Sequence, residues 1–510
     1  MRQTNVLREL IQTNRSGAEN SLTPILLSVL HDFHLKKVAY CYWKSSNNIG
    51  SVLAGHSDLD LLVAKADQHR CEIILLENGL KLFPTMPCRD HPALLSFLGY
   101  DDLTGRLVHV HLHFRLVVGE RLLKNYHLPW EEVILARAIL HPTLPVMILD
   151  PPSEAILLSV RSCLELRLQD PVALRHWRAT TRKFARDRRT LRARVDRVAV
   201  HDLAATLLNE HIANAIVDVV YGDKPLEDQR SLRRQVEAFL APYRTYNMVE
   251  AHMRAAWRAI LWIAGGINKQ FLHLPRPWGR RAPGGGAVVA IVGLDGSGKS
   301  TIVAAIMDWL KPEIDAVPMY FGTGDGRPSL LLLPFKKVLP LVSRVLRTRP
   351  KGSSHGNVSN RSPGILYSVL LTVWAVAVAL EKKSKLLAAR RGADRGLIVL
   401  TDRYPQNELP SFNDGPLLGR LTRAPRWLRR LEASAYALAR RLPPDLVIKL
   451  QITAPTAEAR EPAMEPSVIH ERIDALRYLD FGAKRVVTVS AEAPLAEVIL
   501  RAKSEIWDLL

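Results

Sequence analysis

The sequence predicts an α/β protein in which two different domains are joined by a helical region. Residues 287–292 are an apolar, β-branched run that leads through a glycine-rich loop into a helical pattern, as expected for a parallel strand buried on both faces. Two further apolar runs of strand type follow at 397–400 and 444–450. From 152 to 273 the pattern is helical throughout, whereas residues 1–150 mix helices with strands.

These patterns predict the domain boundaries. We expect an α+β domain over residues 1–150, a helical connecting region over 151–273, and a domain with a parallel sheet in three layers over 287–510. Residues 274–286, rich in Pro, Gly and Arg, are expected to form a linker. A chain of 510 residues is too long for one hydrophobic core, so several domains are expected in any case.

The formal net charge of +20 favours anionic partners such as nucleotides, nucleic acid or a membrane surface. A solvated arginine-rich surface explains many of the same charges. Residues 175–197 are dense in arginine but contain few aromatic residues, so they give no clear nucleic-acid site. The four cysteines lie far apart without C-x-x-C spacing, which predicts reduced thiols and a cytoplasmic location. The oligomeric state stays open, a homodimer included.

One segment, 364–380, is uncharged and apolar enough to raise the question of a membrane span. It is shorter than the roughly 20 residues that a bilayer requires. Because it lies between two parts of one predicted domain, we interpret it as a buried core helix and expect no membrane span. The basic stretch 343–362 before it is expected to be a disordered or mobile flap.

Two carboxylates stand out near the N-terminus. Asp58 and Asp60 are two positions apart on an expected strand, so both point to the same face, as shared coordination of a divalent metal requires. The alternative is that they are exposed strand carboxylates. The next expected strand, 107–117, carries three histidines on one face, which suit either a transition-metal site or a half-solvated strand surface: His109, His111 and His113.

With Ser45 and Ser46 in the preceding loop, the first 150 residues resemble the nucleotidyltransferase superfamily. The resemblance implies that Asp58 and Asp60 hold Mg²⁺ ions for nucleotide transfer. The third carboxylate of that family is replaced here by His111, and imidazole is a poor Mg²⁺ ligand. We therefore interpret this domain as nucleotidyltransferase-like and degenerate.

The glycine-rich loop GLDGSGKST begins where the strand at 287–292 ends. Its glycines let successive backbone N–H groups turn toward phosphate oxygens, and the following helix directs its positive end at the anion. Lys299 can reach the β- and γ-phosphates, and Ser300 can ligate Mg²⁺. The loop predicts a nucleoside triphosphate site made of Gly293, Leu294, Asp295, Gly296, Ser297, Gly298, Lys299, Ser300 and Thr301.

A second motif, TDRY at 401–404, follows the apolar run at 397–400. This order predicts that Asp402 lies at the carboxyl edge of the sheet, where open α/β folds bind ligands. There Asp402 can hold Mg²⁺ or its water, and Arg403 can span the donor and acceptor phosphates.

Together with PDLVIKL at 444–450 and VVTVSAEAPLAEVI at 486–499, these motifs resemble the thymidylate kinase family over residues 287–510. The resemblance implies ATP and Mg²⁺ as cofactors and phosphoryl transfer to a nucleoside monophosphate or a related small phosphorylated acceptor. It also implies that Asp295 faces the acceptor's sugar and that a lid follows the PDL strand, with Arg460 and Arg472 as the nearest equivalents of its arginines. Asp414 suits either a substrate contact or an ordinary turn.

Two rival functions remain. The activity could lie in the N-terminal domain, as Mg²⁺-dependent nucleotidyl transfer with Asp58 and Asp60. Alternatively, the chain could be a non-catalytic ATP-binding scaffold. The sequence therefore predicts a P-loop nucleotide kinase whose catalytic residues are Lys299, Asp402, Arg403 and Asp295, and leaves the acceptor open.

Overall fold

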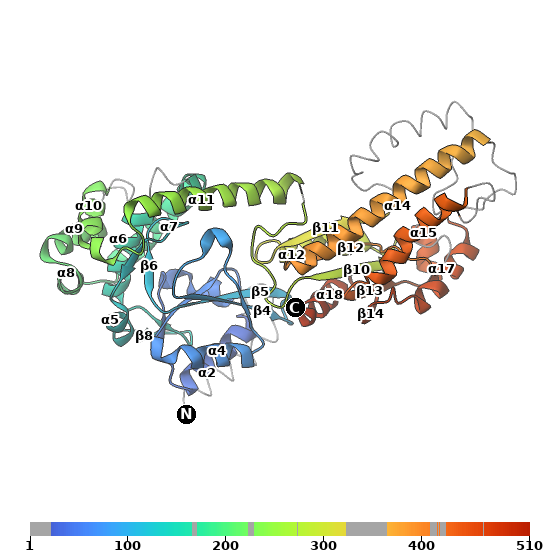
Figure 1. The fold of residues 1–510 in the computed structure, drawn as a ribbon. Coiled ribbons are helices and arrows are strands. Elements are labelled where there is room, and N and C mark those ends of the chain that lie inside the picture. Colours follow the sequence, from blue (N-terminus) through green and yellow to red (C-terminus); the bar gives the residue numbers. More distant parts are fainter. Residues whose placement is uncertain are drawn as a thin grey trace. The chain divides into compact units, whose positions relative to one another are not determined.

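The computed structural model describes residues 22–165, 171–222, 229–272, 274–322, 365–408, 416, 418, 425–462 and 464–510. The predicted flap at 343–362, Asp414 and the first 21 residues of the chain lie outside this part. The described residues form two compact units, which divide between residues 269 and 270. Figure 1 labels the helices and strands of both units.

The N-terminal unit contains a mixed seven-stranded sheet in the order β3-β4-β5-β2-β1-β9-β8, a separate β6–β7 hairpin and many helices. Its strands are β1 Tyr40–Tyr42, β2 Leu59–Val63, β3 Lys81–Phe83, β4 Leu94–Asp101, β5 Arg106–His113, β6 Leu116–Val118, β7 Tyr126–Leu128, β8 Ile139–Leu140 and β9 Met147–Ile148. Its α-helices are α2 Pro24–Leu35, α3 Ile49–Leu53, α4 Gln68–Glu77, α5 Glu131–Ala136, α6 Pro151–Glu165, α7 Pro171–Arg192, α8 Arg197–Leu207, α9 Glu210–Tyr221, α10 Arg230–Phe239 and α11 Met248–Ile267.

This unit has two hydrophobic cores, and the side chains of β2 point alternately into one and the other. Leu59, Leu61 and Val63 face the core that includes α2 and α4. Leu62 faces the other core, which α6, α8, α9 and α10 complete. Since side chains alternate along a strand, Asp60 shares the Leu62 side of the sheet.

The helical prediction for 152–273 is confirmed in the described residues, where helices α6 to α11 follow one another. Three of them begin at side-chain caps. Asp196, Asn209 and Asn247 each accept a hydrogen bond from a backbone N–H of the first turn, at the starts of α8, α9 and α11. Such caps satisfy N–H groups that have no partner within the helix.

The predicted strand at 107–117 is wrong in its extent. The structure ends β5 at His113 and begins β6 at Leu116. Phe114 donates its backbone N–H to Ala93, after which the chain leaves the seven-stranded sheet for the hairpin with β7. The continuous apolar alternation hides this change of sheet.

The C-terminal unit contains a five-stranded sheet in the order β11-β12-β10-β13-β14, and every neighbouring pair of strands is parallel. Its elements are β10 Ala287–Gly293, α12 Lys299–Leu310, β11 Ala316–Tyr320, α14 Ile365–Asp394, β12 Ile398–Asp402, α15 Arg426–Arg441, β13 Leu446–Gln451, α16 Ala454–Arg460, α17 Pro466–Tyr478, β14 Arg485–Ser490 and α18 Leu495–Leu509.

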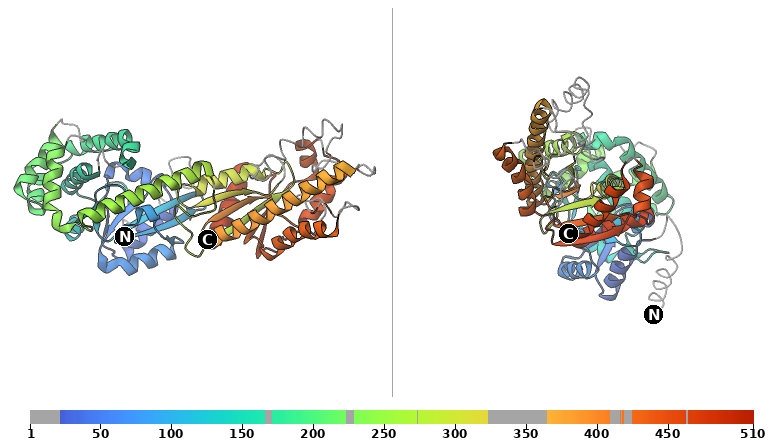
Figure 2. Two further views of the ribbon diagram at one scale, coloured as in Figure 1. Left: turned by 45° about the horizontal axis from the view of Figure 1, so that its top comes forward. Right: turned by 90° about the vertical axis from the view of Figure 1, so that its right-hand side faces the viewer.

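Helices cover both faces of this sheet, which makes it a three-layer α/β fold as predicted. Helices α12 and α18 contact each other, and α14 contacts α15 (Figure 2). From β10 to β11 the chain moves toward one edge of the sheet, and from β11 to β12 it moves back. Since crossovers between parallel strands are generally right-handed, these opposite directions predict that α12 and α14 cover opposite faces. Leu386 and Ala389 of α14 accordingly pack in a core that contains no described residue of α12.

Helix α14 contains the segment predicted to be a buried core helix. That expectation is wrong for one side of the helix, because Val369 is 56% exposed and Val373 and Leu380 are 43% exposed, whereas Ala375 and Ala379 are buried. The uniform apolar composition conceals that, among the residues whose burial is described, one side of the helix is buried and the other is exposed. Within the described part of the chain, no helix has the length and apolar character needed to span a membrane.

Candidate functional site

Strand β10 delivers the glycine-rich loop to the carboxyl edge of the parallel sheet. All seven residues of β10 are buried, as the apolar run predicts. Gly296 and Gly298 have φ angles of +75° and +88°, in the left-handed region that favours glycine, and Gly298 is the N-cap of α12. The glycine spacing thus produces the turn that directs the start of α12 toward the loop.

Gly293 lies where a side chain has no space. A Cβ at this position would be 2.8 Å from the backbone oxygen of Leu450 and 2.5 Å from Ser297 Oγ. We expect Gly293→Ala to lower the free energy of unfolding of this unit by about 1–3 kcal/mol, because the backbone of β13 must move. Gly284→Ala is the matched control, since Gly284 has nothing within 4 Å. Urea unfolding of both variants tests this, and equal stability of the two would contradict it.

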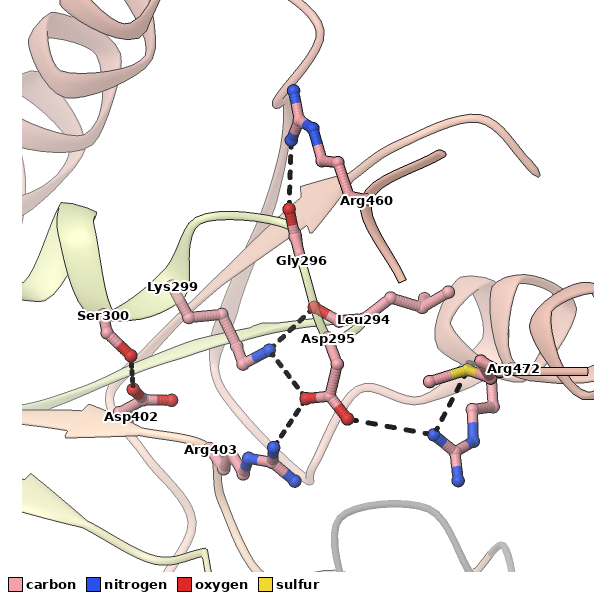
Figure 3. Close-up of polar contacts among 10 residues, drawn as sticks. Leu294, Asp295, Gly296, Lys299, Ser300, Asp402, Arg403, Arg460 and Arg472 are labelled. Carbon is pink, nitrogen blue, oxygen red and sulfur yellow. Dashed lines mark hydrogen bonds and ion pairs between the residues drawn. The ribbon is translucent and has the colours of Figure 1, made fainter. Parts of the chain in front are cut away.

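Asp295 is the centre of a cluster of charges in the loop (Figure 3). Its Oδ1 accepts a hydrogen bond from Arg403 at 2.5 Å and lies 3.5 Å from Lys299 Nζ. Its Oδ2 lies 3.9 Å from Arg472 NH1. Lys299 also donates to the carbonyl oxygen of Leu294 at 2.7 Å. Three cationic side chains, from the start of α12, the end of β12 and α17, therefore converge on one carboxylate.

The charges in this cluster change the protonation equilibria. Burial raises the pKa of Asp295, but the positive charges of Arg403, Lys299 and Arg472 outweigh it and hold that pKa below its ordinary value. Burial lowers the pKa of Lys299, and Asp295 partly restores it.

Ser300 and Asp402 meet at the carboxyl edge of the sheet. Strands β10 and β12 are parallel neighbours with Ile291 opposite Asp402, which places Asp402 beside the loop. Ser300 Oγ donates to Asp402 Oδ2 at 2.6 Å. The other carboxylate oxygen, Oδ1, is buried and has no hydrogen-bond partner within the described residues. One hydroxyl and one carboxylate are thus adjacent, and both are oxygen ligands of the kind that Mg²⁺ prefers.

The remaining predicted residues surround this centre. Arg403 has a φ of +70°, a strained value for a residue other than glycine, while its N–H donates to the carbonyl of Ile291. Arg460 donates to the carbonyl oxygen of Gly296 at 3.0 Å. Ser297 is buried, whereas Thr301 is exposed on the first turn of α12. All of the predicted loop residues lie together with Asp402 and Arg403.

A second cluster lies in the N-terminal unit. Parallel pairing of β2 with β5 places Asp60 opposite His111, the position that sequence reasoning assigned to a third carboxylate. Asp60 Oδ1 lies 3.0 Å from His113 Nε2 and 3.4 Å from His111 Nδ1. Asp58, just before β2, lies 3.3 Å from His109 Nδ1. The predicted aspartates and histidines therefore meet.

Two lysines that sequence reasoning did not assign to this cluster also influence it. Burial raises the pKa of Asp60, yet the charge of Lys44 and hydrogen bonds with His111 and His113 hold it well below the ordinary value. Lys124 adds a further positive charge felt by Asp60. Burial lowers the pKa of His113 to about 3. Lys124 lies in no recognisable motif, so no sequence signal identifies it.

Ser46, which matches the loop serine of the nucleotidyltransferase superfamily, has a hydrogen-bond partner that the sequence did not predict. The backbone N–H and Oγ of Ser46 donate to the two carboxylate oxygens of Glu154, at 2.9 and 2.8 Å. Burial raises the pKa of Glu154, partly offset by these hydrogen bonds. Glu154 is 108 positions away in α6, and only the fold brings it to the loop.

A glycine-rich loop between the first strand of a parallel sheet and its helix, with a serine–aspartate pair beside it, defines the C-terminal unit as a P-loop α/β domain. No family model matches the chain. The chain is 30% identical over 223 residues to the uncharacterized ATP-binding protein YghS of Escherichia coli K12, covering 42% of this chain and 89% of that protein, and it belongs to the same family. It is 27% identical over 225 residues to the uncharacterized ATP-binding protein YghR of the same strain, covering 43% of this chain and 86% of YghR.

Proposed function

We propose that the C-terminal unit binds ATP with Mg²⁺ and transfers the γ-phosphoryl group to a small phosphorylated acceptor, a nucleoside monophosphate or a related molecule. The observation that carries the proposal is the pairing of Ser300 with Asp402 beside the glycine-rich loop. YghS and YghR are both named as ATP-binding proteins, which supports the binding of ATP by this unit. We infer that the aligned 223 residues are those of this unit, because it contains the nucleotide-binding loop.

The residues present fit a Mg²⁺ ion. Ser300 Oγ and Asp402 Oδ1, which has no hydrogen-bond partner among the described residues, would hold the ion or its water, since both are hard oxygen donors. Bound there with ATP, Mg²⁺ would neutralise charge on the β- and γ-phosphates.

The cationic side chains supply the remaining charge. Phosphoryl transfer requires mainly that two substrates be aligned and that negative charge be stabilised. Lys299 and Arg403 already converge within hydrogen-bonding reach of one carboxylate, so the structure orders them before a phosphate arrives. The acceptor oxygen would attack the γ-phosphorus while the bond to the β–γ bridging oxygen breaks, and ADP leaves. Arg403 is suited to contact both phosphates, and Arg472 the acceptor side.

The thymidylate kinase resemblance supports a nucleoside monophosphate as the acceptor. The resemblance assigns Asp295 to the acceptor's sugar, whereas in the structure its carboxylate contacts Arg403, Lys299 and Arg472. We therefore propose that Asp295 positions these cations and that a phosphate competes for them. The class of acceptor is then set by residues beyond this cluster.

Nucleotidyl transfer by the N-terminal unit is less well supported. In such a reaction the loop serine and its N–H would bind a triphosphate, but Glu154 occupies both groups of Ser46. His111 stands at the position that requires a carboxylate. Both contacts favour the interpretation that this unit no longer transfers nucleotides.

A panel of acceptors tests the proposal. Purified full-length protein with ATP and Mg²⁺ is incubated with nucleoside monophosphates, sugars and sugar phosphates, and ADP is measured. We expect one class of phosphorylated acceptor to raise ADP production well above the ATP-only rate, and that increase should vanish when EDTA removes Mg²⁺.

Two outcomes would overturn the assignment. Tight ATP binding without turnover on any acceptor would favour a non-catalytic ATP-binding scaffold. Pyrophosphate release that persists in Lys299→Ala and disappears in Asp58→Ala/Asp60→Ala would instead place the activity in the N-terminal unit.

A further inference from the structure

The aspartate–histidine cluster of the N-terminal unit has a composition unlike that of a Mg²⁺ site. The nucleotidyltransferase resemblance implies Mg²⁺ ions held by carboxylates. Here each of the two possible ligand groups contains one carboxylate and two imidazoles: Asp58 with His109 and His111, and Asp60 with His111 and His113. Mg²⁺ is a hard cation that prefers oxygen ligands, whereas imidazole suits zinc, copper, nickel and iron. The residues present therefore do not fit the implied ion.

We propose that Asp60, His111 and His113 form a binding site for one transition-metal ion of the Zn²⁺ class. Zinc–ligand bonds of about 2.0–2.2 Å in a tetrahedral arrangement place neighbouring ligand atoms roughly 3.3–3.5 Å apart. Asp60 Oδ1 lies 3.0 Å from His113 Nε2 and 3.4 Å from His111 Nδ1, and the three ligand atoms lie within 4.8 Å of one another. The two separations from Asp60 are therefore close to those around a zinc ion, and side-chain rotation would bring the two imidazoles to the same spacing.

The strands hold these ligands in place. Asp60 and His111 are directly opposite each other in the parallel β2–β5 ladder, and His113 is two positions further along the same strand face. The His113 ring packs edge-on against Trp43, with ring centroids 5.0 Å apart, which limits its rotation. Side chains on paired strands are better ordered for metal binding than side chains on loops.

The group of Asp60, His111 and His113 is less exposed than the alternative group, which contains Asp58. The side chains of His111 and Asp60 are 16% and 19% exposed, and that of His113 is 4% exposed, so the site is enclosed but reachable from solvent. Asp58 is 45% exposed and lies 3.9 Å from His111 Nδ1. A three-ligand site that leaves one position open for water or substrate is typical of accessible zinc sites.

The lysines near Asp60 oppose every divalent cation alike, so the donor atoms decide which ion binds. Lys44 and Lys124 both interact electrostatically with Asp60. Their positive charges reduce the affinity for any ion that is held chiefly by electrostatic attraction to carboxylates. Coordination by two imidazoles must therefore supply much of the binding energy. This requirement favours Zn²⁺, Co²⁺ or Ni²⁺ and disfavours Mg²⁺ and Ca²⁺.

The test is metal binding by the full-length chain after a chelator has removed all metals. We expect calorimetry to show one tight Zn²⁺ site for each chain and no competition from millimolar Mg²⁺. Co²⁺ should replace Zn²⁺ and give the visible absorption bands of a low-coordinate site. The readouts do not involve ATP, so they are independent of the proposed kinase activity.

Variants assign the ligands. His111→Ala and His113→Ala should each weaken Zn²⁺ binding at least about 100-fold. The chain has 17 histidines, and those on the surface can bind metal weakly. His69, which is exposed on α4, is therefore the matched control for removal of a surface histidine. His69→Ala and His109→Ala should keep the tight site. Circular dichroism and urea unfolding check that each variant is folded.

Several results would overturn the proposal. Absence of a tight Zn²⁺ site in the wild-type chain would show that the cluster is only a hydrogen-bonded network. Loss of binding in His109→Ala, with binding retained in His113→Ala, would assign the ion to Asp58, His109 and His111 instead. Equal affinities in His111→Ala and His69→Ala would show that the measured sites are surface histidines.

Discussion

Replacing Lys299 with alanine should reduce ATP turnover by at least about 10²–10³-fold, because the ammonium group is the cation best placed for the β- and γ-phosphates. Its side chain is only 7% exposed, and its Nζ is held by Leu294 and Asp295 before any ligand binds. Removing it leaves the fold intact in our expectation, since Asp295 keeps its contacts with Arg403 and Arg472.

ADP production with the best acceptor of the panel, measured beside ATP binding by calorimetry, checks this prediction. Lys484→Ala is the control, because Lys484 is exposed before β14 and away from the loop. Turnover unchanged in Lys299→Ala, with the protein folded, would show that the glycine-rich loop is not the donor site.

The site in the C-terminal unit could be predicted from sequence because its parts are local. The run 287–301 contains a strand, the glycines with positive φ and the start of a helix in one continuous stretch. The place of Asp402 follows from a general rule, since the carboxyl ends of parallel strands meet at one edge of the sheet. Local pattern and sheet geometry thus place Ser300 near Asp402.

Contacts between distant residues could not be predicted in the same way. Nothing in the sequence near Ser46 indicates that Glu154 accepts two of its hydrogen bonds. Likewise, the left-handed conformation of Arg403 follows no glycine signal and depends on its neighbours in the fold. Strand β4 was not predicted because a short apolar run without alternation fits a buried helix as well as a strand.

The aspartate–histidine cluster of the N-terminal unit could be predicted only in part. The alternation of Asp58, Asp60 and the three histidines predicted which side chains share a face, and the register of β2 with β5 places Asp60 opposite His111. The lysines that lie near Asp60 come from other parts of the chain, Lys44 and Lys124. Their charges change the chemistry of the cluster, and only the structure reveals them.

Replacing Asp295 with asparagine should destabilise the ligand-free protein by about 1–3 kcal/mol, because it leaves Lys299, Arg403 and Arg472 close together without their anion. A phosphate supplies the missing negative charge. ATP or a high concentration of inorganic phosphate should therefore raise the melting temperature of Asp295→Asn more than that of the wild type. Turnover should still fall, since the cations lose the carboxylate that positions them.

The pH dependence provides a second test of Asp295. Its pKa is lowered in the folded state, so its contribution to stability is fully present above the ordinary aspartate value of about 4 and is lost as the pH falls through the folded-state pKa. The difference in stability between wild type and Asp295→Asn should be constant from neutral pH to about pH 5 and shrink only at lower pH. Urea unfolding across this range measures it. A difference that already shrinks near neutral pH would mean that the three cations do not hold this carboxylate ionised.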